Sequence, residues 1–400
     1  MMRRLAWVLM ALLLSGCTMG SSVDNRPPGG PAEATVGPDL CLTAVRMIDD
    51  RTGWVQARRE AGALVLLRTT DGGWGWADAT PPELLAAKAG NATFASFFPD
   101  GQTGWVAMTT LLESRSVISV ARTTDGGKRW AYSAIPVLKA ETGSLRLQFT
   151  SPQLGWLLVT SGPQLGTMHK SVYRTEDGGA TWGLVSRNDW PGARATPGAL
   201  PNVEYVTGLS ARNDLSGWVT DIYRSEREIP LYWTQSGGRS WERQPLGYPP
   251  AFADALYANA YPPVFFGADA EAGVLLVEFR SDDPAVLAFR TDDGGNSWEP
   301  AGTSMAGYPA DPYSHFYDFP DAAHGFVMLG ETLYATRDGG QTWSASRLPL
   351  LKDSQLNFVS ERVGWATESG CSRSFYRTGD GGATWLPVRV TAPKRKEAKS

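Results

Sequence analysis

The chain has 400 residues, and its 37 lysines and arginines are outnumbered by 41 aspartates and glutamates, which gives a formal net charge of −4 at pH 7. This acidic balance argues against nucleic-acid binding, because phosphate recognition needs clustered positive charge. Roughly 350 residues remain once the polar ends are set aside, which is more than one ordinary core and suits an architecture that grows by adding units.

Residues 1–16 have the pattern of a signal peptide. Arg3 and Arg4 precede an apolar run (5–14) that is too short to span a membrane stably. The string "LSGC" (14–17) resembles the bacterial lipobox, which implies cleavage before Cys17 and acylation of that residue. Several acyl chains anchor firmly, because each buried methylene contributes about 0.8 kcal/mol. We therefore expect the chain on the extracytoplasmic face of a bacterial membrane, at the cell surface or in the periplasm. The alternative is a secretory signal with a chance cysteine.

The segments next to the two ends have no apolar pattern. Residues 17–38 are rich in Pro, Gly and Ser and are predicted to form a flexible tether. Residues 392–400 ("APKRKEAKS") are predicted to be a basic, disordered tail. Residues 39–391 are left as a single repeat domain.

One ten-residue motif occurs seven times in that domain. The copies are "LRTTDGGWGW" (67–76), "ARTTDGGKRW" (121–130), "YRTEDGGATW" (173–182), "YWTQSGGRSW" (232–241), "FRTDDGGNSW" (289–298), "YATRDGGQTW" (334–343) and "YRTGDGGATW" (376–385). The first glycines of successive copies are 54, 52, 59, 57, 45 and 42 residues apart. Such a period holds four short strands with their turns, the unit of a propeller blade.

A Gly-Trp strand lies upstream of most copies. It reads "TGWVQA" (52–57), "TGWVAM" (103–108), "LGWLLV" (154–159), "SGWVTD" (216–221) and "VGWATE" (363–368), with "AGVLLV" (272–277) and "HGFVML" (324–329) in the fifth and sixth units. Another alternating run precedes each of these strands. Four β runs per unit without helical periodicity predict an all-β repeat.

The Asp-Gly-Gly turn has a structural explanation. The carboxylate can accept bonds from backbone N–H groups, glycine adopts positive φ without strain, and the Trp buries a large apolar area against the neighbouring sheet. A group needed for catalysis is not needed seven times, so we interpret these residues as structural: Asp71, Asp125, Asp177, Ser236, Asp293, Asp338 and Asp380. A four-stranded sheet cannot bury both faces alone, so the units are expected to stack as a seven-bladed β-propeller with these turns between third and fourth strands.

The pattern Thr-x-Asp-x-Gly-x-Thr-Trp resembles the Asp-box, or BNR repeat, of sialidase-type propellers. With the added Gly-Trp strand it is most similar to the photosystem II stability/assembly factor family and its bacterial relatives, over about residues 40–390. Ser236 and Gly75 depart from the pattern. The resemblance implies a binding scaffold with a role in assembly or stability of a membrane complex, although nothing in the chain points to photosynthesis and no basic docking patch is evident.

Two cysteines remain after Cys17. Cys41 begins the first unit and Cys371 lies between the second and third strands of the seventh, so both are expected on one face of adjacent units. A disulfide between them would close a ring whose repeats end without an exchanged strand, and could contribute on the order of 4–5 kcal/mol. The alternative is two free buried thiols.

Three long connections on the face opposite the Asp-Gly-Gly turns carry aromatic residues among prolines. They offer a candidate binding face for a protein or glycan: Trp190, Tyr248, Tyr257, Tyr261, Tyr308 and Tyr313. The same loops could simply pack over the blades. We leave both interpretations open.

The alternative function is a cell-surface glycoside hydrolase, sialidase-like, or a carbohydrate-binding lectin. The arginines that recur in the box strands are poor candidates for a carboxylate-binding triad, because their recurrence indicates packing or pairing. Loop acids could supply a carboxylate pair, namely Glu113, Asp189, Asp254, Asp282, Asp283 or Asp311. We assign no catalytic residue. No zinc spacing or phosphate loop is present, so we expect no metal, no cofactor and a monomer.

The lipobox generates a direct test. Cys17→Ser should move the protein from the membrane fraction to the soluble fraction and abolish labelling by a radioactive fatty acid, because the acylated sulfur is lost. Cys41→Ser should leave both readouts unchanged. Membrane association of the Cys17→Ser protein at the wild-type level would contradict the assignment.

Overall fold

The computed structural model describes residues 36–59, 62–83, 93–112, 115–137, 143–162, 167–188, 194–202, 205–222 and 227–392. The chain divides into two compact units, Met1–Glu33 and Ala34–Ser400, and every described residue belongs to the second. These ranges hold 29 strands and two three-residue 3-10 turns, η1 (Pro250–Phe252) and η2 (Pro349–Leu351). No helix in them is long and apolar enough to cross a membrane. The all-β prediction is confirmed.

Five sheets each contain four consecutive antiparallel strands. The first comprises β1 (Leu40–Met47), β2 (Gly53–Arg59), β3 (Leu64–Thr69) and β4 (Ala77–Asp78), and the second β5 (Phe94–Phe97), β6 (Gly104–Leu112), β7 (Arg115–Thr123) and β8 (Ala131–Val137). The third comprises β9 (Ser144–Phe149), β10 (Gly155–Thr160), β11 (Lys170–Thr175) and β12 (Gly183–Arg187). The last two comprise β22 (Tyr317–Asp318), β23 (Gly325–Leu329), β24 (Thr332–Thr336) and β25 (Ser344–Arg347), and β26 (Ser354–Phe358), β27 (Gly364–Glu368), β28 (Phe375–Thr378) and β29 (Leu386–Pro387).

The fourth and fifth sequence repeats share one nine-stranded sheet. Its strands are β13 (Tyr205–Ala211), β14 (Gly217–Ile222), β15 (Leu231–Thr234), β16 (Glu242–Arg243), β17 (Tyr257–Ala260), β18 (Val264–Phe266), β19 (Ala272–Arg280), β20 (Ala285–Thr291) and β21 (Glu299–Ala306). Strands β17 and β18 both pair with β19, separated by Pro262 and Pro263, which cannot donate to a ladder. The displaced β17 pairs with β14 at Ile222–Asn259 and so joins the two repeats.

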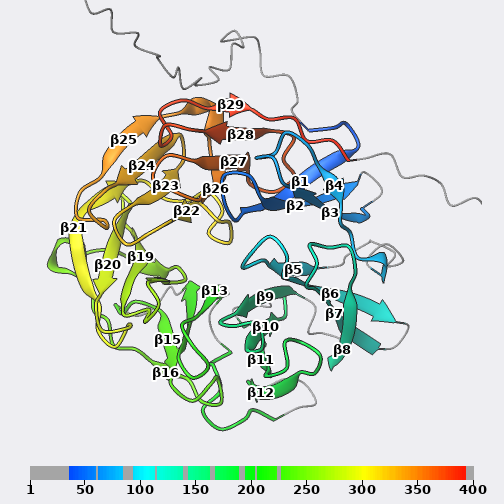
Figure 1. The fold of residues 1–400 in the computed structure, drawn as a ribbon. Helices are drawn as coiled ribbons and strands as arrows, with labels where there is room; N and C mark the ends of the chain where they lie inside the picture. The colour runs from blue at the N-terminus through cyan, green and yellow to red at the C-terminus, as the bar shows by residue number, and fades with distance from the viewer. Residues whose placement is uncertain are drawn as a thin grey trace, which may run out of the picture. The chain divides into compact units, whose positions relative to one another are not determined.

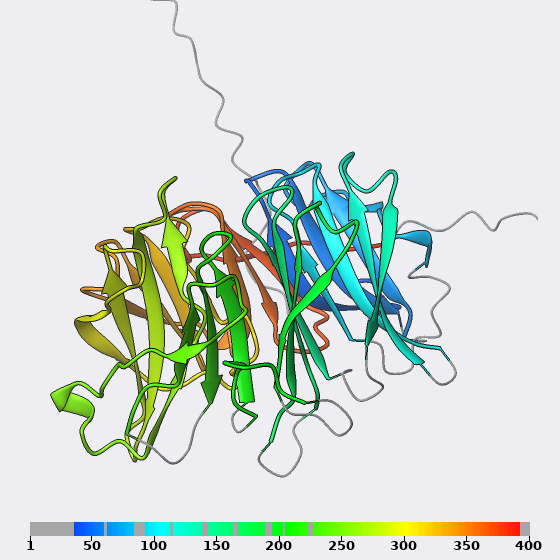
Figure 2. The same cartoon turned by 90° about the horizontal axis from the view of Figure 1, so that it is seen from below.

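The sheets follow one another in chain order, with the first strands β5, β9, β13, β22 and β26 on the inner side (Figure 1). Figure 2 shows strands of neighbouring sheets running side by side, with turns and loops at their two ends. At one of these ends, the first glycine N–H of each Asp-Gly-Gly turn donates to the turn between the first two strands, as from Gly178 to the Gln153 carbonyl at 2.8 Å. These two sets of turns therefore share one face, as predicted.

The Asp-Gly-Gly turns share one hydrogen-bond pattern. In the third copy the Thr175 hydroxyl donates to Asp177 Oδ1 at 2.8 Å and accepts from the Gly179 N–H at 2.8 Å. The Thr181 N–H and hydroxyl donate to the Asp177 carboxylate at 2.9 and 2.6 Å. These bonds, those from Thr181 foremost, lower the pKa of Asp177 to about 2. In the fourth copy Ser236 accepts the equivalent N–H bond from Ser240 at 2.9 Å, so the turn survives without the charge.

The glycine of the Gly-Trp strand makes room for an aromatic ring. A Cβ on Gly155 would lie 2.5 Å from the Phe149 ring, which ends the strand beside it. Trp105, from the preceding repeat, stacks on that same ring with centroids 3.7 Å apart. A side chain at Gly155 would therefore break the stack between two repeats.

Seven hydrophobic clusters connect the repeats. Each contains the residue after the Gly of the Gly-Trp strand from one repeat and packs against the box Trp of the next repeat: Trp54 with Trp130, Trp105 with Trp182, Trp156 with Trp241, Trp218 with Trp298, Val274 with Trp343, Phe326 with Trp385, and Trp365 with Trp76. The last pair joins the seventh repeat to the first. The prediction that the box indoles pack against neighbouring sheets is confirmed.

Polar side chains near the inner edges of the sheets also connect each repeat to the next. These bonds run from Gln56 to Ser96, from Thr93 to the Gly143 carbonyl (3.2 Å), between Gln148 and the Ala211 N–H (2.8 Å), from Thr207 to the Ala260 carbonyl (2.6 Å), from Tyr317 to the Pro262 carbonyl (2.7 Å), from the Phe358 N–H to Asp318 (2.7 Å) and from Gln355 to the Thr43 carbonyl (3.3 Å). The inner edges are thus hydrogen-bonded between sheets as well as within them.

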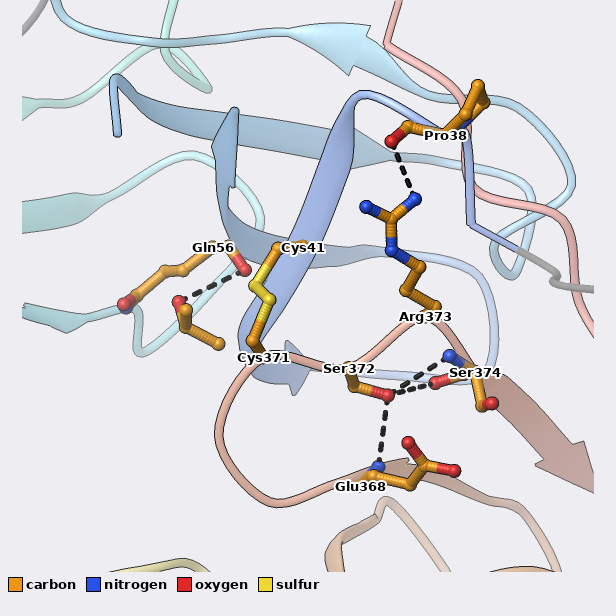
Figure 3. The surroundings of a disulfide bond; sticks show 9 residues. Pro38, Cys41, Gln56, Glu368, Cys371, Ser372, Arg373 and Ser374 are labelled. Carbon is orange, nitrogen blue, oxygen red and sulfur yellow. Dashed lines mark hydrogen bonds between the residues drawn. A yellow bond between two sulfur atoms is a disulfide. The ribbon is translucent and has the colours of Figure 1, made fainter. Parts of the chain in front are cut away.

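Cys41 and Cys371 form a disulfide across 330 residues of sequence, as predicted (Figure 3). The first and last sheets are each built of consecutive strands, so no strand is exchanged between them, but isolated bridges join the chain ends. Val36 forms a parallel bridge with Val390, and Leu42 an antiparallel bridge with Ser372. Val36 belongs to the segment 17–38 that the sequence assigns to the tether. These bridges satisfy backbone groups that the ends of the domain would otherwise expose.

The disulfide should dominate the closure of the domain. Cys41→Ser with Cys371→Ser should lower the thermal midpoint and the urea midpoint, because the crosslink restricts the unfolded chain by on the order of 5 kcal/mol. The bridges at Val36 and Leu42 should keep the double variant folded. Calorimetry should give the same thermal midpoint for the double variant and for the reduced wild type. An unchanged midpoint in both would contradict this role.

The box aspartates should make stability depend on pH. Asp177 and Asp338 have folded pKa values of about 2, against 3.8 when unperturbed, so their contribution is complete above pH 4 and is lost as pH falls towards 2. Asp177→Ala should lower the free energy of unfolding by about 1 kcal/mol at pH 7 and by progressively less towards pH 3. Urea titration at each pH measures this difference. Ser236→Ala, which removes no charge, should cost the same at both pH values. A pH-independent cost for Asp177→Ala would contradict this account.

Candidate functional site: the central cavity

The first strands of the repeats enclose a cavity of about 1580 Å³. Residues of β1, β5, β9, β13, β18, β22 and β26 line it, with further residues from turns and loops at both ends of these strands. At one end these include Gly370–Cys371, between the second and third strands of the seventh repeat, and 311–315, in the connection from the fifth repeat to the sixth. At the other end they include residues 320–322, between the first two strands of the sixth repeat, so the cavity runs between the two faces.

Charged residues of the cavity wall come mainly from the first strands and the loops near them. Arg46 of β1 has an exposed side chain, and Arg146 of β9 is half-buried. The side chain of His315, in the loop near them, is exposed to the cavity. Its pKa falls to about 4, first through desolvation within the cavity and then through the positive charges of Arg146 and Arg46. The imidazole is therefore neutral at pH 7.

The connection between the fifth and sixth repeats brings Asp311, Tyr313 and His315 to the cavity wall. Asp311 accepts a bond from the Tyr313 N–H at 2.9 Å, and its backbone carbonyl accepts from the Ser314 hydroxyl at 2.8 Å. Burial lowers the pKa of Arg146, while the negative charge of Asp311 opposes that shift. The negative charge of Asp311, in the connection to the sixth repeat, thus raises the pKa of Arg146 in the third repeat.

Asp318 of β22 is held by its neighbours in the seventh repeat. It accepts bonds from the Phe358 N–H at 2.7 Å and from the Asn357 side chain at 3.0 Å. Burial raises its pKa, against the opposing charge of Arg46. This carboxylate is bound to protein donors, so we interpret it as a link between repeats.

The structure does not bring the six candidate binding-face aromatics together. Tyr313 is 45% exposed and lines the cavity, and Tyr308 is 45% exposed beneath Arg280, whose guanidinium lies 3.8 Å from the ring centroid. Tyr261 is 1% exposed and donates to Glu278 at 2.6 Å, so its assignment to an exposed face is wrong. Half-buried Tyr248 packs edge-on against Phe279, and half-buried Tyr257 opens β17. Trp190 lies outside the described residues, as do Cys17, Glu113 and Asp189.

The recurrent box arginines connect neighbouring sheets. Arg68 donates to the Gly101 carbonyl of the next repeat at 2.8 Å while its guanidinium lies 5.5 Å from the Trp54 ring centroid. Arg290 donates to the Asp338 carbonyl at 3.2 Å. These contacts fit the expected packing role. Within the described residues no group of three or more His, Cys, Asp and Glu side chains is placed to hold a metal ion.

Of the polar cavity groups, His315 lies in one of the three long connections that the sequence assigns to the candidate binding face, whereas Arg46, Arg146 and Asp318 were not predicted. Their signal was a charged or polar residue within the first strand of a repeat or just before it, as in "AVRM" and "LRLQF".

No family model matches the chain, and no curated protein matches it. Among solved structures, prolyl oligopeptidase B from Galerina marginata (H698A mutant) aligns with a TM-score of 0.51 at 13% identity, over 89% of this chain and 51% of that one. A polysaccharide lyase described as PL25 ulvan lyase aligns with a TM-score of 0.49 at 11% identity (88% and 98%), and SapL1 lectin with α-methyl fucoside with 0.40 at 13% (79% and 98%). The chain spans about half the length of the oligopeptidase. At these identities the likeness concerns fold, which is all-β and propeller-like.

Proposed function

We propose that the chain is a lipid-anchored, extracytoplasmic seven-bladed β-propeller that binds a carbohydrate in its central cavity. The seven blades are supported by seven box turns and by the seven hydrophobic clusters, the last of which unites Trp365 with Trp76. The lipid anchor rests on the "LSGC" string alone.

The observation that carries the binding function is the size and lining of the cavity. About 1580 Å³ exceeds the space taken by one small ligand, typically about 300–1,000 Å³, and suits an oligomer. The wall combines rings such as Phe94, Phe97 and Tyr313 with arginine, amide and hydroxyl groups. Sugar rings need this mixture, because their C–H faces pack on aromatic rings while their hydroxyls need directional hydrogen bonds.

The hydrogen bonding of the inner edges favours a sugar over a peptide. An extended peptide would add to an exposed strand edge through backbone bonds. Here side chains from neighbouring repeats already bond such groups, including the carbonyls of Thr43, Ala260 and Pro262 and the N–H of Phe358. Recognition in the cavity therefore depends on side chains.

The scaffold role expected from the sequence has no comparable support. A role in a membrane complex rests on the sequence resemblance alone, whereas the cavity is formed by described residues. The three aspartates of the cavity wall give hydrolysis no specific support, because Asp318 is bound by donors of the seventh repeat and Asp311 and Asp321 accept bonds from backbone N–H groups of their own turns. We therefore propose binding without turnover.

A glycan array, followed by calorimetric titration, tests this proposal. The full chain in detergent should bind an oligosaccharide of three or more units. We expect a dissociation constant between about 1 μM and 1 mM, which corresponds to a binding free energy between about −8 and −4 kcal/mol. Tyr313→Ala should weaken binding about tenfold, because the exposed ring loses its stacking partner. Tyr132→Ala, which removes another exposed tyrosine outside the cavity, is the control. Binding of peptides but of no glycan would overturn the proposal.

A further inference from the structure

The cavity differs in charge from the rest of the molecule. Five arginines line it (Arg46, Arg58, Arg59, Arg146 and Arg373) against three aspartates (Asp311, Asp318 and Asp321). The whole chain carries a net charge of −4. Positive charge in a partly enclosed space attracts anions more strongly than the same charge on an open surface, because water screens it less.

Three of these arginines already have protein partners. Arg59 pairs with Asp39, Arg373 donates to the Pro38 carbonyl (Figure 3), and the Arg58 guanidinium lies 5.4 Å from the Phe94 ring centroid. Arg46 of β1 and Arg146 of β9 come from different repeats and line the same cavity, and Arg146 also donates to the Leu145 carbonyl at 3.2 Å. The Met47 N–H bonds to Asn357 and the Leu356 N–H donates to the His315 carbonyl at 2.8 Å, so Arg46 and His315 both lie beside β26. The charges of both arginines lower the pKa of His315, in keeping with two guanidinium groups that face the same part of the cavity.

The charge near that point is poorly balanced. His315 is neutral at pH 7 and adds no charge. Asp318, the carboxylate near Arg46, is bound by Phe358 and Asn357. Asp311, the carboxylate near Arg146, belongs to a loop that holds it through local bonds with Tyr313 and Ser314. A ligand anion can replace a loop carboxylate at lower cost than one bonded between two strands.

We propose that the cavity selects an anionic saccharide, whose acidic group binds between Arg46 and Arg146 while Asp311 occupies the neighbourhood of Arg146 in the empty protein. Guanidinium groups suit this task because they form paired, charge-assisted bonds to carboxylate or sulfate oxygens. The inference rests on the proposed carbohydrate function and narrows it to acidic sugars. Asp311 becomes a specificity-determining residue, since its charge competes with the ligand.

Matched glycan pairs provide the first test. An array should carry oligogalacturonate beside its methyl ester and a sulfated oligosaccharide beside its desulfated form, so that each pair differs only in charge. The full chain should bind one acidic member at least tenfold more tightly than its neutral partner. The preferred pair distinguishes a carboxylate from a sulfate ester. Equal binding of the two members of every pair would overturn the anion selectivity and leave the carbohydrate function intact, whereas no binding to any glycan would overturn both.

Variants then identify the residues. Arg46→Gln and Arg146→Gln should each weaken the acidic ligand about 10- to 100-fold and leave its neutral partner unchanged, while Arg146→Lys should restore part of the loss. Asp311→Asn should strengthen the acidic ligand several-fold. Arg337→Gln, which removes an exposed arginine from a box turn outside the cavity, is the matched control. Retained selectivity in Arg46→Gln and Arg146→Gln proteins with wild-type thermal midpoints would overturn the assignment. If either fails to fold, titration of Asp311→Asn decides instead, and unchanged affinity there would overturn the role of Asp311.

Discussion

The packing of an indole from one repeat against the next sheet is the interaction on which the rest of this structure depends. A four-stranded sheet of this length buries too little area to be stable alone. Trp105 illustrates the solution, since it stacks on Phe149 of the next repeat and donates its ring N–H to the Gly178 carbonyl of that repeat's turn at 2.8 Å. The Thr–Asp bonds keep that turn in the shape that receives the indole. Without this contact, neither the inner strands nor the cavity between them would have fixed positions.

Much of this arrangement could be predicted because its cause is local. A turn that requires two glycines at positive φ, here 72° at Gly178 and 89° at Gly179, leaves a recognisable string each time it occurs. The Cys41–Cys371 pairing followed from the order of strands alone. The bridge from Val36 to Val390 could not be predicted, because its partners are far apart in sequence and neither carries a turn or packing signal.

The candidate site was harder to predict for the same reason. Tyr261 and Tyr313 both occur in proline-rich loops and both line the cavity, yet Tyr261 is 1% exposed and bonded to Glu278, whereas Tyr313 is 45% exposed. Composition cannot separate these outcomes, because they depend on how each segment packs against the strands. Arg46 and Arg146 are 100 positions apart and are brought near His315 only by the packing of three repeats. Their common location is a property of the tertiary structure.

The prolines that interrupt the inner strand of the fifth repeat have a mechanical consequence. Backbone bonds from β14 to β17 join two repeats in one continuous sheet, whereas the other junctions combine side-chain contacts with isolated backbone bonds, such as that from the Thr303 N–H to the Gln341 carbonyl and the bridge between Leu42 and Ser372. The junctions between repeats should therefore differ in stiffness. We expect the fourth and fifth repeats to move together, with small openings of the domain concentrated at the junctions that no continuous sheet crosses.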